Sequence, residues 1–437
     1  MNQAGERKNS SVIPSFNRTI RIDFRGAKIS SDAGVLMLRE IDERFNITTP
    51  LGDCLDDPRR ASHLRHTYVD LIRQRVYQMA AGYEDCNDAN HLRIDPALRL
   101  ALGKDEEYAA SQSMLSRLEN EILGNEKGLA ALDETLQRSI DALLRKKAKS
   151  KLIIDLDSTE DPAHGKQEGV AYNGHFEKNC YHPLFCFTSE GDCLGVKLRE
   201  GNVHSADGAL KMLVPIVERH RDRFKRFWLR ADAAFGKPEI YDYCETNRIT
   251  YFIRLKSNPV LQEFIEPDLR RPVGRPPKSG IQTKWIDFYY QAGSWDKPRR
   301  VICKIEWHEG ELFPRIGFIV TNSRLEATKV VKVYNGRAEI ENRIKEGKNT
   351  LRWDKTSCRR FEANEARLKM GVIAYNLLHL LRTVHVRGEG VRRSIEWLIR
   401  RLIKVGATVS YHARRWHVHV SSAFPLDHHF RAVFDTG

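Results

Sequence analysis

The 437-residue sequence lacks several features that assign a chain to a common class of protein. Its most apolar long stretch, Met370 to Leu381, has 12 residues and includes Asn376 and His379, so it is too short and too polar to span a bilayer. No segment near the N-terminus joins a basic stretch to an apolar core, so we expect no secretory signal and no integral membrane protein. The sequence also has no internal repeat and no long low-complexity segment.

Cysteine pairs with metal-site spacing are missing as well. The 8 cysteines include no C-x-x-C pair, which excludes zinc-ribbon and thioredoxin-like sites. Cys180, Cys186 and Cys193 lie close together in the sequence, but at strand-like positions. We therefore expect reduced, buried thiols in a cytosolic protein.

Charge is the feature that the sequence does have, and it is unevenly distributed. Hydrophobic residues make up 41% and charged residues 30%, which is typical of a soluble globular chain. The net charge of +14 indicates a polyanionic partner such as nucleic acid. Residues 1–150 are neutral, residues 151–250 carry −2, and residues 251–437 carry +16. A polyanion should therefore lie mainly against the second half, whereas the acidic middle is where metal-binding carboxylates are expected.

The patterns of apolar residues predict an α/β chain with five regions. Helical spacing in residues 1–145 predicts a helical N-terminal region that binds DNA. Residues 146–258 have the strand–helix order β-β-β-α-β-α-β, which predicts a mixed sheet. Residues 259–330 alternate in a strand-like way and predict a β-rich insertion. Residues 331–385 then return to the catalytic domain, and residues 386–437 are expected to be a helical part that contacts DNA or oligomerises, with a short strand at residues 417–420.

Two of the predicted strands end in carboxylates. The strand Leu152–Asp157 carries Asp155 and Asp157, and the strand Arg226–Asp232 ends in Asp232. Side chains at the carboxyl ends of neighbouring strands can converge above a sheet. Converging carboxylates suit Mg²⁺ or Mn²⁺, and two such ions can promote an in-line attack on a phosphodiester. Asp also ends many strands as ordinary turn chemistry, so this pattern alone leaves both interpretations open.

A later segment, Tyr334–Lys348, is predicted to be one helix. At about 100° per residue, Tyr334, Arg337, Glu341 and Lys348 fall within an arc of about 60°. The face would join a carboxylate to groups that bind phosphate or stack on a base. A solvated helix with i,i+4 charge pairs is the alternative.

These four residues fit the pattern Y-x₂-R-x₃-E-x₆-K, and the chain thereby resembles bacterial insertion-sequence DDE transposases. It is most similar to the branch called transposase DDE domain group 1, over roughly residues 20–425. Further stretches carry the same resemblance: Asp155–Asp161 with His164 and Gly165, Leu198–Asn202, Leu229–Asp232 with Phe235, Thr321–Asn322 and Ala413–Arg415.

The resemblance implies an RNase H-like catalytic domain with a D-D-E metal triad. The residues that match are Asp157, Asp232 and Glu341, and the triad would hold two Mg²⁺ or Mn²⁺ ions. Asp157 is preferred because Asp157-Ser-Thr159 resembles the family's D-x-T pattern, with Asp155 as the fallback. The long gap between Asp232 and Glu341 agrees with the β-rich insertion of similar transposases.

The expected function is that of a DNA transposase. It would bind the terminal inverted repeats of its element, cut with metal-activated water and join the freed 3′-OH to target DNA, as a homodimer when DNA-bound. It is expected in the cytoplasm, associated with the nucleoid and with no membrane. The alternatives are an RNase H-fold nuclease or resolvase that cannot join strands, and a DNA-binding protein derived from a transposase. The expected DNA-binding residues are Tyr334, Arg337, Lys345, Lys348, Arg275, Trp295 and Arg117.

The last three of these residues each have a plainer interpretation. Arg275 lies in Gly274-Arg-Pro276, which resembles the core of a minor-groove hook but is also compatible with a basic surface loop. Trp295 could stack on a flipped base, or pack in the core. Arg117 ends a segment that resembles the start of a DNA-reading helix.

Overall fold

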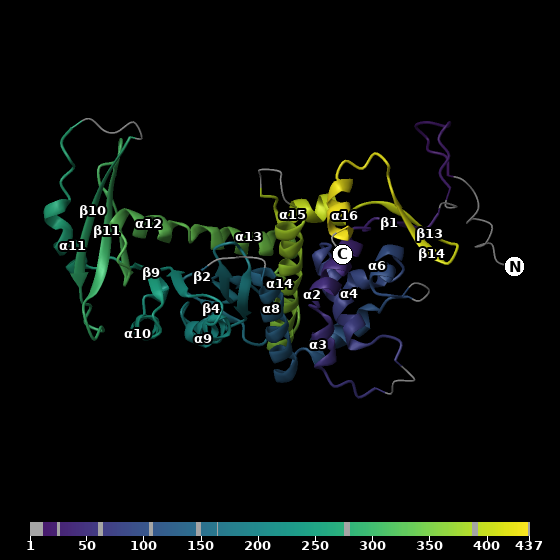
Figure 1. Cartoon of the computed structure of the whole chain (residues 1–437), viewed down its shortest axis with the longest axis horizontal. Coiled ribbons are helices and arrows are strands. Elements are labelled where there is room, and N and C mark those ends of the chain that lie inside the picture. The colour runs from purple at the N-terminus through teal and green to yellow at the C-terminus, as the bar shows by residue number, and fades with distance from the viewer. Residues whose placement is uncertain are drawn as a thin grey trace. The chain divides into compact units, whose positions relative to one another are not determined.

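The computed structural model describes residues 12–23, 27–59, 64–104, 108–145, 150–163, 165–274, 280–386 and 392–435 (Figure 1). The chain forms two compact units, and each is described by itself. The first unit joins residues 1–118 to residues 380–437, and the second comprises residues 119–379. None of the described helices is long and apolar enough to cross a membrane.

The first unit is mostly helical and contains one small sheet. Its three strands lie in the order β1-β13-β14, with antiparallel pairing throughout. The sequence predicted a short strand at residues 417–420, within β14, but not its partner β13. The elements are β1 (Ile29–Ser30), α2 (Val35–Phe45), α3 (Thr49–Asp53), α4 (Tyr68–Ala80), α5 (Ala89–Leu92), α6 (Pro96–Ala101), α7 (Gln112–Arg117), α15 (Ile395–Leu398), β13 (Ala407–His412), β14 (Arg415–Val420) and α16 (Asp427–Phe434).

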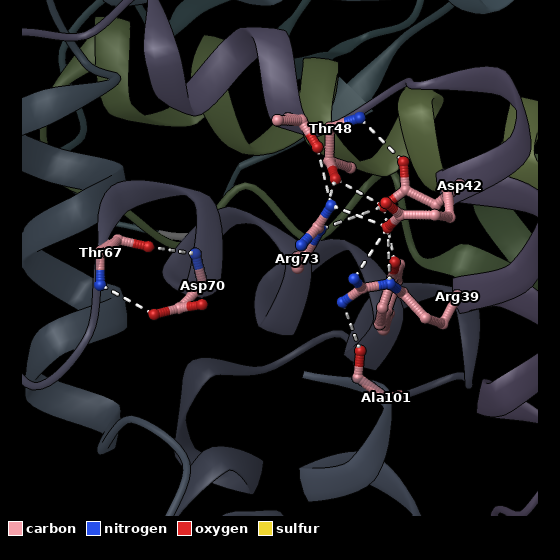
Figure 2. A network of polar contacts seen from close by, with 10 residues as sticks. Arg39, Asp42, Thr48, Thr67, Asp70, Arg73 and Ala101 are labelled. Carbon is pink, nitrogen blue, oxygen red and sulfur yellow. Dashed lines mark hydrogen bonds and ion pairs between the residues drawn. The ribbon is translucent and has the colours of Figure 1, made fainter. Parts of the chain in front are cut away.

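A buried polar network fastens the helices of this unit, as Figure 2 shows. Asp42 of α2 accepts hydrogen bonds from the Thr48 amide at 2.8 Å and the Tyr77 hydroxyl at 2.6 Å. Arg73 of α4 approaches the same carboxylate at 3.6 Å, and Arg39 donates to the Ala101 carbonyl at 2.9 Å. Because buried polar groups are costly unless they are paired, this network defines one arrangement of α2, α4 and α6.

The start of α4 has a complete capping box, which is also visible in Figure 2. The Thr67 hydroxyl accepts from the Asp70 amide at 3.2 Å, and the Asp70 carboxylate accepts from the Thr67 amide at 2.9 Å. These bonds satisfy two of the amides that a helix leaves unpaired at its N-terminus. By contrast, α2 begins after Gly34 and has no side-chain cap.

The second unit is built on an eight-stranded mixed sheet in the order β10-β11-β12-β9-β8-β2-β6-β7. Strand β2 pairs antiparallel with β6 and parallel with β8, and β8 pairs parallel with β9. This order confirms the predicted RNase H-like mixed-sheet class. The elements before the insertion are α8 (Glu126–Arg145), β2 (Lys151–Ser158), β3 (Asp161–Pro162), β4 (Ala171–Asn173), β5 (Lys178–Tyr181), β6 (Leu184–Thr188), β7 (Cys193–Lys197), α9 (Ala209–His220), β8 (Arg226–Ala231), α10 (Pro238–Thr246) and β9 (Thr250–Leu255).

The insertion continues this sheet instead of forming a separate one. Strand β12 pairs antiparallel with β9, and β11 and β10 follow in turn. The alternating pattern of residues 259–330 thus corresponds to three strands of this sheet. The remaining elements are α11 (Pro259–Ile265), β10 (Ile281–Tyr290), β11 (Arg299–His308), β12 (Arg315–Thr321), α12 (Ala327–Asn335), α13 (Ala338–Leu351) and α14 (Phe361–Val384).

The helix predicted at residues 334–348 is in fact two helices, α12 and α13. Helix α12 ends at Asn335 with Gly336 as its C-cap residue, and Arg337 is the N-cap residue of α13. A Cβ atom at residue 336 would collide with the guanidinium of Arg230 in the neighbouring strand β8. Glycine therefore permits the close approach of this turn to the sheet, and it also weakens the helix at that point. Figure 1 shows α12 and α13 following one another beside the sheet.

Candidate active site

Two carboxylates lie side by side at the carboxyl ends of β2 and β8. The strands are parallel, and their register pairs Leu156 with Ala231, so Asp157 and Asp232 take the next matched positions. Asp157 is buried, whereas the Asp232 side chain retains 38% of its exposure. Asp232 also accepts a hydrogen bond from the Ala234 amide at 3.0 Å, which fixes its carboxylate at the end of the strand. The pairing of the strands is thus sufficient to bring the two groups together.

The third carboxylate comes from the first turn of α13, where Glu341 and Arg337 are one helical turn apart. One nitrogen of Arg337, Nη1, lies 2.9 Å from Glu341 Oε1. The other, Nη2, lies 2.8 Å from Asp157 Oδ1 and 3.9 Å from Asp232 Oδ2. Three carboxylates from three separate elements therefore surround one buried guanidinium.

Asp155 lies on the same strand but has a different partner. Arg230 holds it with two hydrogen bonds of 2.6 Å, from Nε to Oδ1 and from Nη2 to Oδ2. Arg230 also donates from Nη1 to the Val333 carbonyl in α12 at 2.9 Å. Burial raises the pKa of the Asp155 carboxyl, and the Arg230 hydrogen bonds oppose that rise. With both oxygens bound to Arg230, Asp155 joins the sheet to α12, and Asp157 is the better candidate for a metal ligand.

The other two residues of the motif flank the carboxylates. Tyr334 lies in the last turn of α12 and packs against a core cluster that includes Phe252, and burial raises its pKa. The Lys348 ammonium donates to Thr159 Oγ1 at 2.8 Å and also to the Glu160 carbonyl. Burial lowers the pKa of Lys348. These contacts tie α13 to the loop that follows β2, so the motif spans the active-site edge of the sheet.

The environment of Asp157 favours a proton on its carboxyl group. Its pKa is raised from the ordinary 3.8 to about 7, mainly by burial; the charge of Arg337 opposes this rise, and the charges of Asp232 and Glu341 contribute to it. A group that binds a proton more tightly in the folded chain than in the unfolded chain makes stability depend on pH. Here the folded chain binds the extra proton between about pH 4 and pH 7.

We therefore expect the metal-free protein to lose stability as the pH rises from about 4 to about 7, and to stay at the lower value above that range. The Asp157→Asn variant lacks this ionisation, so its Tm should fall less over the same range and exceed the wild-type Tm at pH 8. Thermal melts in a chelating buffer measure both. Burial also raises the pKa of Asp161 to about 7, so the ionisation of Asp161 should account for the fall in Tm with pH that remains in the Asp157→Asn variant. Parallel curves for wild type and Asp157→Asn would contradict the assignment.

The three carboxylates have the donor chemistry that a divalent metal needs. Carboxylate oxygens are hard ligands of the kind that Mg²⁺ and Mn²⁺ prefer. In this structure Arg337 lies among them, and within the described ranges no three His, Cys, Asp or Glu side chains are grouped to hold one ion. The donor set fits a divalent metal if the guanidinium withdraws, because three negative charges would then face one another. Asp157, Asp232 and Glu341 are the residues that would hold it.

The remaining expected DNA-binding residues differ in their exposure. Lys345 is exposed on α13, and Arg117 is exposed at the end of α7 in the first unit. Trp295 is 6% exposed and packs edge-on against Tyr241 and Tyr290, so its ring belongs to the core of the insertion. Arg275 lies outside the described residues, as does His164. A DNA contact by any of them stays a prediction.

Sequence reasoning missed the role of Arg230. The available signal was a charged residue inside the apolar strand 226–231, which predicts a buried ion pair and not a surface group. It also missed the position of Arg337 among the three carboxylates. Its spacing relative to Glu341 gave one of these contacts as an i,i+4 pair, but the contact with Asp157 depends on how α13 packs on β2.

Comparison with known proteins decides the family. Residues 12–436 match the family model described as transposase DDE domain group 1. The chain belongs to this family. The resemblance inferred from Tyr334, Arg337, Glu341 and Lys348 is thereby confirmed. No curated protein matches this member of the DDE domain group 1 family.

Among solved structures, this group 1 transposase chain is similar to one described as the cryo-EM structure of piggyBac transposase synaptic complex with hairpin DNA. The two share 13% identity with a TM-score of 0.45, over 90% of this chain and 82% of that chain.

Proposed function

We propose that the chain is the DNA transposase of an insertion sequence, which binds the terminal inverted repeats and catalyses strand cleavage and strand transfer with two divalent metal ions. The proposal rests on one observation: the carboxylates of Asp157 and Asp232, at the ends of two strands, and of Glu341, on helix α13, approach the same guanidinium. Membership of a DDE transposase family supports it.

In this proposal Asp157, Asp232 and Glu341 hold the ions at the carboxyl edge of the sheet. Bound there, the ions supply an activated water and stabilise the leaving oxygen of a phosphodiester. Arg337 gives up its carboxylate contacts and donates to a phosphate oxygen of the DNA end, for which its planar fork is suited. Lys348 contributes a second positive charge about three helical turns after Arg337 along α13.

The proposed partners are double-stranded DNA of two kinds, the element ends and the target. The net positive charge of the chain lies after residue 250, which agrees with a DNA track beside the carboxylates. We further propose that two copies pair the two ends, and that the protein acts in the cytoplasm at the nucleoid.

Strand joining tests this function. Purified protein is incubated with Mg²⁺, labelled end DNA taken from the sequence that flanks the coding region, and a supercoiled target plasmid. A transposase should transfer the label to the plasmid, and omission of Mg²⁺ should prevent this. Cleavage with no transfer of label would point to a nuclease of the same fold, whereas binding with no chemistry would point to a DNA-binding derivative.

A further inference from the structure

A basic cavity lies beyond the C-terminal end of α13. It has a volume of about 670 Å³ and lies between the segment at residues 166–167 and the loop at residues 352–359. It belongs to the same unit as the candidate active site. The residues that line it are Pro162, Lys166, Gln167, Arg352, Asp354, Lys355, Thr356, Ser357 and Arg359.

The lining is strongly cationic, and much of its charge is not neutralised by the protein. It contains four bases against one carboxylate, that of Asp354. Among the described residues, no carboxylate lies within ion-pairing distance of Lys166, Arg352 or Arg359. Elsewhere on the same helix the guanidinium of Arg343 is paired with a glutamate at 3.0 Å. The three cations Lys166, Arg352 and Arg359, gathered around a hollow, suit an anionic ligand with several oxygens.

The two walls of the cavity are held in place by the main chain of the loop. Gln167 donates from Nε2 to the carbonyl oxygens of Thr356 at 2.5 Å and Cys358 at 2.8 Å. The Glu168 amide donates to the Arg359 carbonyl at 3.0 Å. These bonds fix the backbone of the loop against residues 166–168, so the backbone that carries the cations does not have to be organised when a ligand arrives.

The cavity also lies in line with the active-site motif. Along α13, Lys348 follows Glu341 by about 10 Å of helix, and Arg352 follows Glu341 by about 16 Å, at about 1.5 Å per residue. At about 3.4 Å per nucleotide of one strand, the longer distance corresponds to about five nucleotides. A strand whose scissile phosphate lies at the carboxylates could therefore reach the cavity with a phosphate a few nucleotides away.

We propose that this cavity binds phosphodiester groups of the element-end DNA, a few nucleotides from the point of cleavage. The inference rests on the proposed function and adds a second anchor to it. Arg352 and Arg359 donate to phosphate oxygens from the loop after α13, and Lys166 faces the same groups from the other wall. By fixing the strand on the far side of Lys348, the cavity sets the register in which the scissile phosphate meets Asp157, Asp232 and Glu341.

The test measures the affinity of the full chain for the element-end duplex as a function of NaCl concentration. The slope of log K against log salt is negative, and each lost phosphate contact makes it less steep by about 0.9. The double variant Arg352→Gln with Arg359→Gln should therefore have a slope that is less steep by about 1.8. The matched control is Lys225→Gln with Arg226→Gln, which removes two exposed cations at the opposite end of β8 and should keep the wild-type slope.

A second measurement locates the contact on the DNA. Methylphosphonate substitution of single phosphates a few nucleotides from the cleavage point should weaken binding by wild type and by the control, but not by the double variant. Lys166→Gln, on the facing wall, should make the slope of log K against log salt less steep by about 0.9. This variant gives an independent test if the double variant does not fold.

The outcomes separate this inference from the proposed function. Suppose that wild type binds and cuts the end DNA, and that the Arg352/Arg359 variant keeps the wild-type salt dependence of binding and the wild-type sensitivity to methylphosphonate substitution. The cavity proposal is then overturned and the proposed function stands. If that variant instead loses only a thermal stabilisation by inorganic phosphate, the cavity is a site for free phosphate and not for DNA. If wild type does not bind the end DNA, the proposed function itself fails.

Discussion

Replacing Glu341 with glutamine is expected to abolish strand cleavage of the element-end DNA and to leave end binding within a few-fold of wild type. The amide keeps the size of the side chain but loses the negative charge that a divalent metal needs. The expected loss of cleavage rate is at least about 10²–10³-fold, the scale on which one charge-stabilising group contributes to a transition state. Gel analysis of end-labelled DNA with Mg²⁺ measures cleavage, and a mobility-shift titration measures binding.

The matched control for this variant is Glu339→Gln on the same helix. Glu339 is exposed and lies 3.0 Å from Arg343, away from the carboxylates at the sheet edge. The Glu339→Gln variant loses one negative charge two residues before Glu341, so it should cleave the end DNA at nearly the wild-type rate. Wild-type cleavage by Glu341→Gln, or an equal loss in both variants, would contradict the role assigned to Glu341.

Replacing Arg230 with methionine is expected to lower the free energy of unfolding of the second unit by about 3–5 kcal/mol. The substitution leaves the Asp155 carboxylate, which is 1% exposed, without the guanidinium that binds both of its oxygens. It also removes the hydrogen bond to the Val333 carbonyl that ties α12 to the sheet. Urea unfolding followed by tryptophan fluorescence measures the loss.

Two variants make this second prediction specific. Arg315→Met breaks an ion pair with Glu311 on the exposed β11–β12 hairpin and should leave the free energy of unfolding nearly unchanged. Adding Asp155→Leu to Arg230→Met removes the uncompensated carboxyl and should restore a large part of the lost stability. If Arg230→Met unfolds like wild type, the buried pair does not support the sheet in the way described.

The central strands of the mixed sheet could be predicted from the sequence because their signals are local. The apolar run before Asp157 and the apolar run before Asp232 each mark a buried strand with a carboxylate at its end, and neighbouring parallel strands bring their ends together. The insertion was predictable for the same reason, since its three strands alternate along their own length.

Features that depend on contacts between distant segments could not be predicted in this way. The helix predicted across residue 336 breaks because Gly336 approaches Arg230, which lies more than 100 residues earlier in the chain. Strand β13 was missed because its apolar residues are few and its pairing with β1 joins opposite ends of the sequence. The burial of Trp295 likewise depends on Tyr241.

The central claim is that Asp157, Asp232 and Glu341 together hold the catalytic metal. The most direct test is the uptake of Mn²⁺ by the complex of protein and end DNA, followed by the paramagnetic resonance signal of free Mn²⁺. Wild type and Glu339→Gln should each take up two ions per active site, and the triple variant Asp157→Asn, Asp232→Asn, Glu341→Gln should take up none there. Equal uptake by wild type and the triple variant would contradict the account.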